Sequence, residues 1–410
     1  MNYVIIGNST AAVGCIEGIR QHDQKGHITV ISSEPYHTYS RPLISYLLLG
    51  KTDEQRMKYR PDDFYEKTGC TTMFGETVTR IDKDAQTVEL ASGTCVPYDQ
   101  LMVATGSRPF VPPMAGLDTV PKAFTFMSLD DAHALDGAID ENSRVLIVGA
   151  GLIGLKCAEG IWDRVGSVTV VDLADRILPS ILDADGAAMV QRHLEKQGVS
   201  FILGDSVAAF DGGTATLKTG GTLTFDVLVI AVGVRPNTAL VADAGGDVNR
   251  GIVIDAFGHT SLPHVYAAGD CTESYDISCD QRRILALLPN AYMQGYCAGE
   301  TMAGHPADFT NAIPMNAIGF AGLHILTAGS YTGEVYEDIR EDSYKKLFFE
   351  GNLLKGYILI GDVERAGIYT SLIRNRTPLD EIDFELVCEK PQLMAFKKKN
   401  RKTMLGGQTA

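Results

Sequence analysis

The stretch RVLIVGAGLIGLKCAEG, residues 144–160, decides the fold. Its first five residues read as a buried strand, and the turn that follows has the spacing G-x-G-x-x-G at Gly149, Gly151 and Gly154. We expect a helix next, and then a second apolar strand, SVTVV, that leads to Asp172. A strand, glycine turn, helix, strand and carboxylate in this order predict a dinucleotide-binding βαβ unit.

The first residues of the chain repeat this plan. A strand at Tyr3–Ile6 leads into the turn GNSTAAVG, a helix and the strand HITVIS, after which Glu34 stands. Ser9 and Ala12 occupy positions where glycine is more usual, but both are small enough for a phosphate to approach the backbone. We expect this turn to face a pyrophosphate and Glu34 to accept hydrogen bonds from a ribose diol.

Three later segments end strands with glycine. YDQLMVATGSRP (98–109) and FDVLVIAVGVRPN (225–237) each bring a strand to a turn with glycine and proline, and SLPHVYAAGDC (261–271) ends at Gly269 and Asp270. A helix is expected after Pro289. From about residue 306, the short strands KKLFFEG and LLKGYILIG indicate an antiparallel sheet closed by helices.

The predicted fold class is therefore α/β, with two Rossmann-like dinucleotide-binding domains and a C-terminal α+β domain. The first domain is expected to be discontinuous, at 1–110 and 251–305, and interrupted by the second at 111–250. The α+β domain is expected at 306–387, and a basic tail at 388–410.

Composition limits the function. A net charge of −15 over 410 residues argues against a nucleic-acid or anionic-membrane partner. The eight cysteines are scattered with no C-x-x-C, so no metal site is predicted. No apolar stretch reaches about 18 residues, and the first strand starts too early for a signal peptide. A soluble cytoplasmic protein is expected.

Together, the two glycine turns, ATGSRP, AVGVRPN and the TSLPHVYAAGD segment from Thr260 resemble the two-dinucleotide-binding-domain flavoproteins, the pyridine nucleotide–disulfide oxidoreductase family. The resemblance covers about residues 1–385. It is strongest to the branch with NADH–rubredoxin reductases, ferredoxin reductases and the flavin portion of NADH-dependent nitrite reductase. It implies FAD and NAD(H) as cofactors.

The resemblance also assigns residues to the two cofactors. Those assigned to FAD are Gly7, Asn8, Ser9, Ala11, Ala12, Glu34, Arg41, Pro42, Thr105, Gly106, Gly269, Asp270, Asn290 and Ala291. Those assigned to NAD are Gly149, Gly151, Leu152, Ile153, Gly154, Asp172 and Gly233. In this reading Glu34 belongs to the ADP half, Arg41 reaches toward the flavin, and the helix at Asn290 points its positive end at the flavin ring. Asp172 would repel a 2′-phosphate, which favours NADH over NADPH.

The segment SRPLISYLLLGK (40–51) departs from the relatives that use a thiol. Those relatives carry a cysteine just before the glycine, where this chain has Leu49, and no cysteine lies between Cys15 and Cys70. Electrons reaching the flavin are therefore expected to leave directly from it. Tyr46 and Lys156 replace a lysine and a glutamate of the reductase branch. We expect the two near the flavin N5 as tentative catalytic residues, and the alternative is that Lys156 points to solvent.

The predicted function is that of an FAD-dependent NADH:acceptor oxidoreductase whose partner is an iron–sulfur or rubredoxin-type protein. A second setting for the same activity is that of the NAD-facing flavoprotein subunit of a larger redox complex. Two alternatives are a flavin NADH oxidase that reduces O₂ directly and an NADH-responsive flavoprotein that is not an enzyme. The C-terminal module implies either a homodimer or a cover for the flavin.

Clusters of basic residues are candidates for docking an acidic protein partner. The candidate docking cations are those of 281–283, Arg374 with Arg376, and those of 397–402, with solvated surface charge as the alternative. Cys157 and Cys271 are expected to be buried and Cys279 to lie at the surface, none with a redox role.

Overall fold

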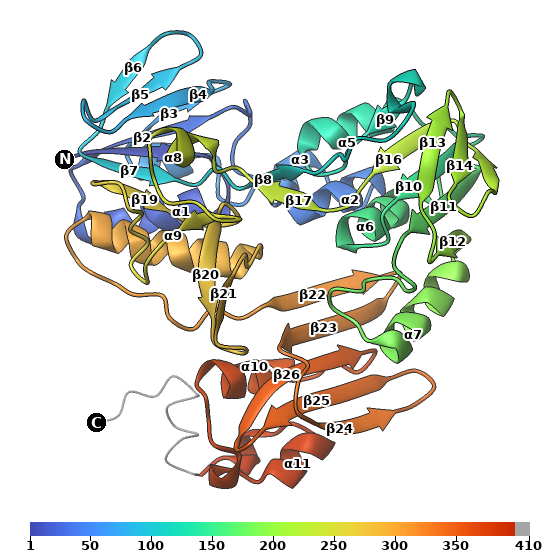
Figure 1. The fold of residues 1–410 in the computed structure, drawn as a ribbon. Coiled ribbons are helices and arrows are strands. Elements are labelled where there is room, and N and C mark those ends of the chain that lie inside the picture. Colours follow the sequence, from blue (N-terminus) through green and yellow to red (C-terminus); the bar gives the residue numbers. More distant parts are fainter. Residues whose placement is uncertain (398–410) are drawn as a thin grey trace. The chain divides into compact units, whose positions relative to one another are not determined.

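The computed structural model describes residues 1–397, which form two compact units (Figure 1). Unit 1 consists of Met1–Glu273 and Leu288–Phe309, and unit 2 consists of Ser274–Leu287 and the residues from Thr310 onward. Both expected dinucleotide-binding halves lie within unit 1, except for residues 274–287.

The first half of unit 1 is built on a parallel sheet in the order β19-β7-β1-β2-β3. Its strands are β1 (Asn2–Ile6), β2 (His27–Ser32), β3 (Cys70–Phe74), β7 (Gln100–Val103) and β19 (Val265–Ala267). A three-stranded antiparallel sheet is inserted before β7 and consists of β4 (Val78–Asp82), β5 (Thr87–Leu90) and β6 (Cys95–Pro97).

The second half repeats this plan with a parallel sheet in the order β12-β11-β10-β16-β9. Its strands are β9 (Ala123–Phe124), β10 (Arg144–Val148), β11 (Ser167–Asp172), β12 (Val199–Leu203) and β16 (Val227–Ile230). The matching antiparallel insertion is β13 (Val207–Asp211), β14 (Thr214–Leu217) and β15 (Thr222–Thr224). The chain passes between the halves along β8 (Ser107–Pro109) and β17 (Val234–Pro236), which pair antiparallel (Figure 1).

Helices cover these sheets because their apolar faces have no other partner. In unit 1 they are α1 (Thr10–His22), α2 (Ile44–Leu48), α3 (Glu54–Met57), α4 (Phe64–Lys67), α5 (Leu129–Asp136), α6 (Leu152–Ile161), α7 (Ala184–Glu195), α8 (Ala239–Asp243) and α9 (Leu288–Met302). No helix formed by residues 1–397 combines the length and the apolar character that crossing a bilayer would require.

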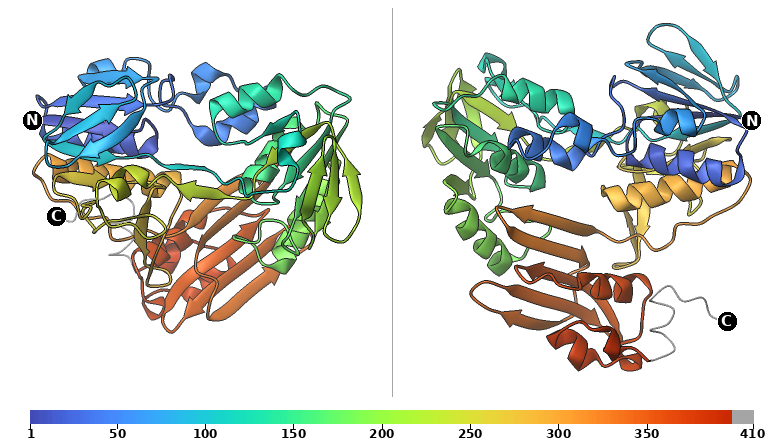
Figure 2. Two further views of the ribbon diagram at one scale, coloured as in Figure 1. Left: turned by 45° about the horizontal axis from the view of Figure 1, so that its top comes forward. Right: turned by 180° about the vertical axis from the view of Figure 1, so that it is seen from behind.

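Helices α1 and α9 lie side by side in every view (Figure 2). Glycines on both helices allow the two backbones to approach each other closely. A Cβ at Gly14 of α1 would lie 3.0 Å from the Tyr296 nitrogen of α9. A Cβ at Gly295 of α9 would lie 2.8 Å from the Ala11 carbonyl carbon of α1. The two backbones are therefore in direct contact, which fixes α9 against α1.

Unit 2 is the expected antiparallel sheet, in the order β22-β23-β26-β25-β24. Its strands are β22 (Met315–Phe320), β23 (Leu323–Gly329), β24 (Glu334–Ile339), β25 (Tyr344–Glu350) and β26 (Leu353–Ile360). Helices α10 (Ala366–Arg374) and α11 (Phe384–Glu389) pack on one face of the sheet through a core that includes Leu347, Tyr357, Tyr369 and Val387.

Two expected boundaries differ from the structure. Residues 274–287 were expected in the first domain but belong to unit 2, because the hairpin of β20 (Thr272–Asp276) and β21 (Gln281–Arg283) buries Ile277 in the core of that unit. The expected tail begins too early at residue 388, because Cys388 and Phe396 are buried in the same core. The remaining tail, 398–410, lies outside the described residues.

Candidate functional site

The first glycine turn has the backbone that a phosphate-binding turn needs. Gly7 follows β1 with φ +114°, and its N–H donates to the carbonyl of Ile31 at 2.8 Å. A Cβ here would lie 2.8 Å from the Ala104 carbonyl carbon and closer still to its oxygen, so only glycine fits. The N-cap Ser9 makes no side-chain cap bond within the described chain, and the first turn of α1 carries no acid. The first N–H groups of α1 thus remain available to an anion.

A cavity of about 490 Å³ opens beside this turn. The predicted FAD residues that line it are Gly7, Asn8, Ser9, Ala11, Glu34, Arg41, Thr105, Gly106, Gly269, Asp270 and Ala291. Ala12 and Asn290 are buried, at 0% and 2% exposure, and Pro42 is exposed. Side chains from separate strand ends thus converge on one space, and its volume is within the usual range for a cofactor site.

The residues of this cavity fit a dinucleotide flavin. Two helices begin at it, α1 and α9, and neither has an acid in its first turn, so no carboxylate in either first turn opposes the attraction of their positive ends for pyrophosphate and flavin oxygens. Asn8 is held for this arrangement, because its amide donates to the Tyr36 carbonyl at 3.1 Å and accepts from the Tyr65 hydroxyl at 2.5 Å.

Asp270 lies at the end of the TSLPHVYAAGD segment, on the cavity wall. Burial raises the pKa of this carboxyl, although the Ser107 hydroxyl donates to it at 3.3 Å and the Arg41 charge opposes the rise. A carboxyl that lacks full solvation is suited to pair with the hydroxyl groups of a ligand.

The sequence reasoning missed the walls that come from distant loops. The missed residues on the cavity include Thr125, Met127, Ser128, Asp131 and Asn237. Asn237 and Thr105 exchange two hydrogen bonds: the Thr105 hydroxyl donates to the Asn237 carbonyl at 2.7 Å, and the Asn237 amide donates to the Thr105 carbonyl at 2.9 Å. Asn237 is the last residue of the AVGVRPN segment, and this position at the end of a strand-to-glycine segment could have identified it from the sequence as a cavity residue.

The second glycine turn has the same construction as the first. Gly149 has φ +117°, and its N–H donates to Val171 O at 2.8 Å, while Gly151 is the N-cap of α6 and Leu152 and Ile153 form its first turn. A Cβ at Gly154 would lie 3.1 Å from the Gly149 carbonyl carbon, so this glycine lets helix and strand approach closely.

Asp172 stands at the expected strand end but is already bonded to the protein. Its two oxygens accept from the N–H groups of Ala150, at 2.6 Å, and Ala174, at 2.7 Å. Next to this turn, Leu173 is 69% exposed and Val232, beside Gly233, is 37% exposed. Exposed apolar side chains at two strand ends are suited to cover the faces of a flat aromatic ring.

Helix α2, in SRPLISYLLLGK, packs against α5 and α6. The Lys156 ammonium of α6 lies 4.5 Å from the centre of the Tyr46 ring and is paired with Glu159, whose side chain is 3% exposed. Lys156 itself is 17% exposed, so the alternative that it simply points to solvent is wrong. Neither Lys156 nor Tyr46 lines the 490 Å³ cavity, and their relation to the flavin N5 stays a prediction.

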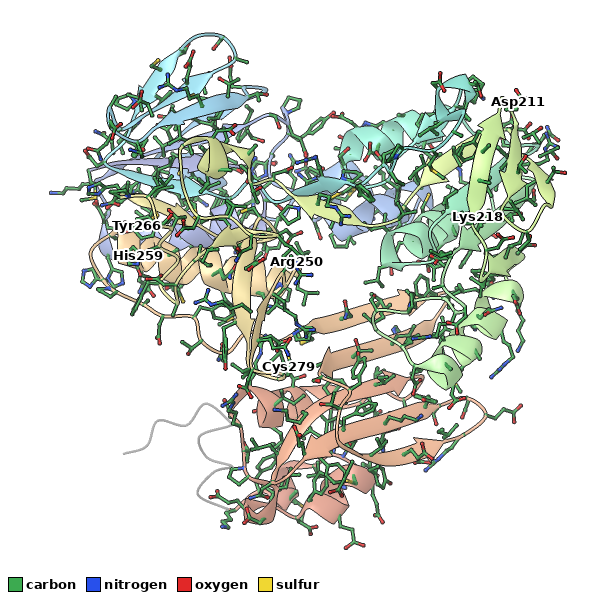
Figure 3. All side chains as sticks on the ribbon, viewed as in Figure 1. Asp211, Lys218, Arg250, His259, Tyr266 and Cys279 are labelled. Atoms are coloured by element: carbon green, nitrogen blue, oxygen red, sulfur yellow. The ribbon has the colours of Figure 1, made fainter. Side chains whose placement is uncertain are left out.

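All eight cysteines are free thiols, and none lines the cavity. Cys157 and Cys271 are buried as expected, and burial raises the pKa of Cys271 to about 11. Cys279 lies in the turn between β20 and β21 (Figure 3) and is half-buried, with its thiol 3.5 Å from the Asp276 carboxylate. A buried, protonated thiol is a poor nucleophile, so the structure offers no thiol relay beside the cavity among the described residues.

Two of the candidate docking cations are paired inside unit 2, and two buried nitrogens of a third, Arg374, have no hydrogen-bond partner within the described chain. Arg283 forms an ion pair with the buried Asp276, and Arg376 forms one with Asp280. Of the group 397–402, only residue 397 lies within the described chain. No group of three or more metal-binding side chains is found in residues 1–397.

Two Rossmann-type turns in one compact unit, one of them opening on a large cavity, define the class of oxidoreductases that bind both FAD and NAD(H). Comparison with known families agrees. The model of pyridine nucleotide-disulphide oxidoreductases matches residues 1–295, and that of the rubredoxin NAD+ reductase C-terminal domain matches residues 314–377. The chain belongs to the pyridine nucleotide-disulphide oxidoreductase family and uses FAD and NAD(H).

Individual relatives extend this likeness over nearly the whole chain. The epsilon subunit of NADH-dependent phenylglyoxylate dehydrogenase from Aromatoleum evansii is 32% identical over 390 residues, 92% of each chain. "Probable ferredoxin reductase CtmF" from Castellaniella defragrans is 33% identical over 310 residues, 74% of this chain and 76% of its own. Among solved structures, the covalent putidaredoxin reductase–putidaredoxin complex matches with a TM-score of 0.87 and 23% identity, covering 99% of this chain and 98% of the other, which shows a shared fold.

Proposed function

We propose that this protein carries electrons from NADH, through its FAD, to a small one-electron protein of the iron–sulfur or rubredoxin type. The observation that carries the proposal is the absence of any cysteine among the residues that line the cavity, together with Leu49 at the end of α2. FAD, when bound, supplies the exchange between a two-electron hydride donor and one-electron acceptors. Without a neighbouring thiol, the exchange with the acceptor takes place at the flavin itself.

The chain's own residues have distinct tasks in this proposal. The turn at Gly7 and the start of α1 bind the pyrophosphate of FAD, Glu34 binds its adenosine ribose, and Asp270 orients its hydroxyl-bearing chain. The turn at Gly149 binds NADH. Asp172, already fixed by two backbone N–H groups, meets the adenosine ribose with a negative charge, which favours NADH over NADPH.

Lys156 and Tyr46 are proposed to set the electrostatics where the nicotinamide meets the flavin. The ammonium is held over the Tyr46 ring and against Glu159, so its position is fixed before a ligand arrives. The pair lies on α2 and α6, the helices that join the two halves of unit 1.

The biological setting is proposed from the relatives. One relative is named a ferredoxin reductase, and the one that matches over 92% of both chains is named as a subunit of a dehydrogenase. Both names support a protein partner as acceptor or donor. We therefore propose that the chain either serves a free carrier or forms the NAD-facing subunit of a larger redox complex, and that its C-terminal unit can form a homodimer.

The test is an anaerobic assay of NADH oxidation by the purified flavoprotein, with a rubredoxin and a [2Fe–2S] ferredoxin as separate acceptors. The proposal expects reduction of at least one carrier to outpace O₂ consumption, measured in an aerobic parallel, by more than tenfold. O₂ uptake that matches or exceeds the rate with every carrier would overturn it in favour of an NADH oxidase.

A further inference from the structure

The Tyr39 hydroxyl lies behind the cavity wall, where it bonds to two residues that line the cavity, Glu34 and Arg41. Tyr39 is 8% exposed. Its hydroxyl donates to Glu34 Oε2 at 2.8 Å, and it accepts from Arg41 Nη1 at 3.2 Å and from the Leu129 N–H at 3.0 Å. A phenol has one proton to donate and lone pairs to accept, so all of its hydrogen-bonding capacity is spent on these three groups.

The first consequence concerns the Glu34 carboxylate. Its Oε1 accepts from Arg41 Nη2 at 2.5 Å, while its Oε2 accepts from Tyr39. Each oxygen of a carboxylate can accept about two hydrogen bonds. Both oxygens therefore keep capacity for a ribose hydroxyl, while one donor on each side fixes the plane of the group. Without the Tyr39 hydroxyl, Glu34 would be fixed at one oxygen only.

The second consequence concerns an adjoining part of the cavity wall, the segment Thr125–Asp131. The segment Thr125–Asp131 contributes four residues to the cavity, although it lies some 90 residues further along the chain. It is tied to the first half of unit 1 by the Tyr39–Leu129 bond, by Arg41 Nη1 donating to Met127 O at 3.4 Å, and by the Tyr36 hydroxyl on Asp130. The group that fixes Glu34 thus also fixes the start of α5.

We propose that Tyr39 is a positioning residue for FAD: it holds the Glu34 carboxylate toward the adenosine ribose and links occupancy of the cavity to the order of the segment Thr125–Asp131. The inference rests on the assignment of this cavity to FAD. Burial raises the pKa of Tyr39, so the phenol stays protonated and remains a donor at physiological pH. The Tyr39 hydroxyl bonds both to Glu34, which is assigned to FAD, and to Leu129 in the second half of unit 1. Loss of FAD should therefore loosen the Tyr39–Leu129 contact.

The experiment compares Tyr39→Phe with Tyr3→Phe. Tyr3 is also buried and also donates to a carboxylate, Asp23 at 3.0 Å, but Asp23, unlike Glu34, does not line the cavity. FAD is first removed from each protein, and the affinity of the apoprotein for added FAD is measured by calorimetric titration. The rate of amide hydrogen exchange is followed at Leu129. We expect Tyr39→Phe to weaken FAD binding about tenfold and to speed exchange at Leu129 in the FAD-loaded protein, and Tyr3→Phe to change neither.

Equal FAD affinity and equal exchange at Leu129 in the wild type and Tyr39→Phe would overturn the inference. A second variant keeps the test sharp: in a Glu34→Gln background, Tyr39→Phe should weaken FAD binding much less, because it acts through Glu34. Full additivity would also contradict the proposal. FAD affinity and hydrogen exchange at Leu129 are measured without an electron acceptor. If the protein binds FAD but reduces no carrier, the proposed function is wrong, but the role of Tyr39 can still be tested.

Discussion

Replacing Gly149 with alanine tests whether the second glycine turn is built as described. A Cβ at this position would lie 2.6 Å from the carbonyl carbon of Ala231 and closer to its oxygen, a separation that real Cβ atoms essentially never show. The end of β16 would have to move. The left-handed φ of +117° adds strain of about 1–2 kcal/mol for an L-residue, and overpacking adds about 1–3 kcal/mol. We expect a total loss of about 2–5 kcal/mol in the free energy of unfolding.

Gly151→Ala is the matched control two residues away. Gly151 has φ −81°, and no atom lies within 4 Å of the position that its Cβ would take. Its stability should stay within about 0.5 kcal/mol of the wild type.

The assay is urea unfolding followed by the fluorescence of Trp162, the chain's single tryptophan, which caps the C-terminus of α6 and so reports on this unit. If Gly149→Ala and Gly151→Ala unfold at the same urea concentration, the account of the turn is wrong.

Three further outcomes are expected. Lys156→Glu sets a second carboxylate beside the buried Glu159, so stopped-flow reduction of the flavin by NADH should change far more than flavin content; an unchanged rate would refute a role at the flavin. Because burial raises the pKa of Cys271 to about 11, only about a thousandth of it is thiolate at pH 8. Iodoacetamide at that pH should leave carrier reduction unaffected, and inactivation would point to a redox thiol. Hydrogen bonds from Arg144 hold the pKa of Asp226 below its usual range, so their stabilisation is present at pH 7 and lost as the pH falls below about 4. Asp226→Asn should destabilise the protein at pH 7 and by a smaller amount at pH 2, as judged by urea midpoints, because part of this stabilisation is already lost there.

The sequence was sufficient where function depends on local backbone. Both glycine turns, their helices and the acids after them follow from spacing, because a turn at positive φ admits little but glycine and a strand that precedes it is apolar. A Cβ at Gly7 would clash with the carbonyl of Ala104, and a Cβ at Gly149 would clash with that of Ala231. This shared steric requirement explains why the first glycine of each turn can be predicted from the sequence.

Features that depend on tertiary contact could not be predicted. Tyr39 stands in an unremarkable loop, and only the fold brings it to Glu34 and Leu129. Likewise, the hairpin around Cys279 reads as a polar loop, yet the adjacent Ile277 is buried in the core of unit 2. The ion pair of Lys156 with Glu159 is compatible with helix spacing, but its burial and the Tyr46 contact come from the packing of α2 on α6.

The central claim is that electrons leave the flavin with no sulfur intermediate. Anaerobic reductive titration of the purified flavoprotein, followed by its visible spectrum, tests it most directly. We predict full reduction after about two electrons per FAD, with no absorbance change that depends on thiols. Uptake of about four electrons per FAD, as a flavin plus a redox-active disulfide would require, would contradict the account.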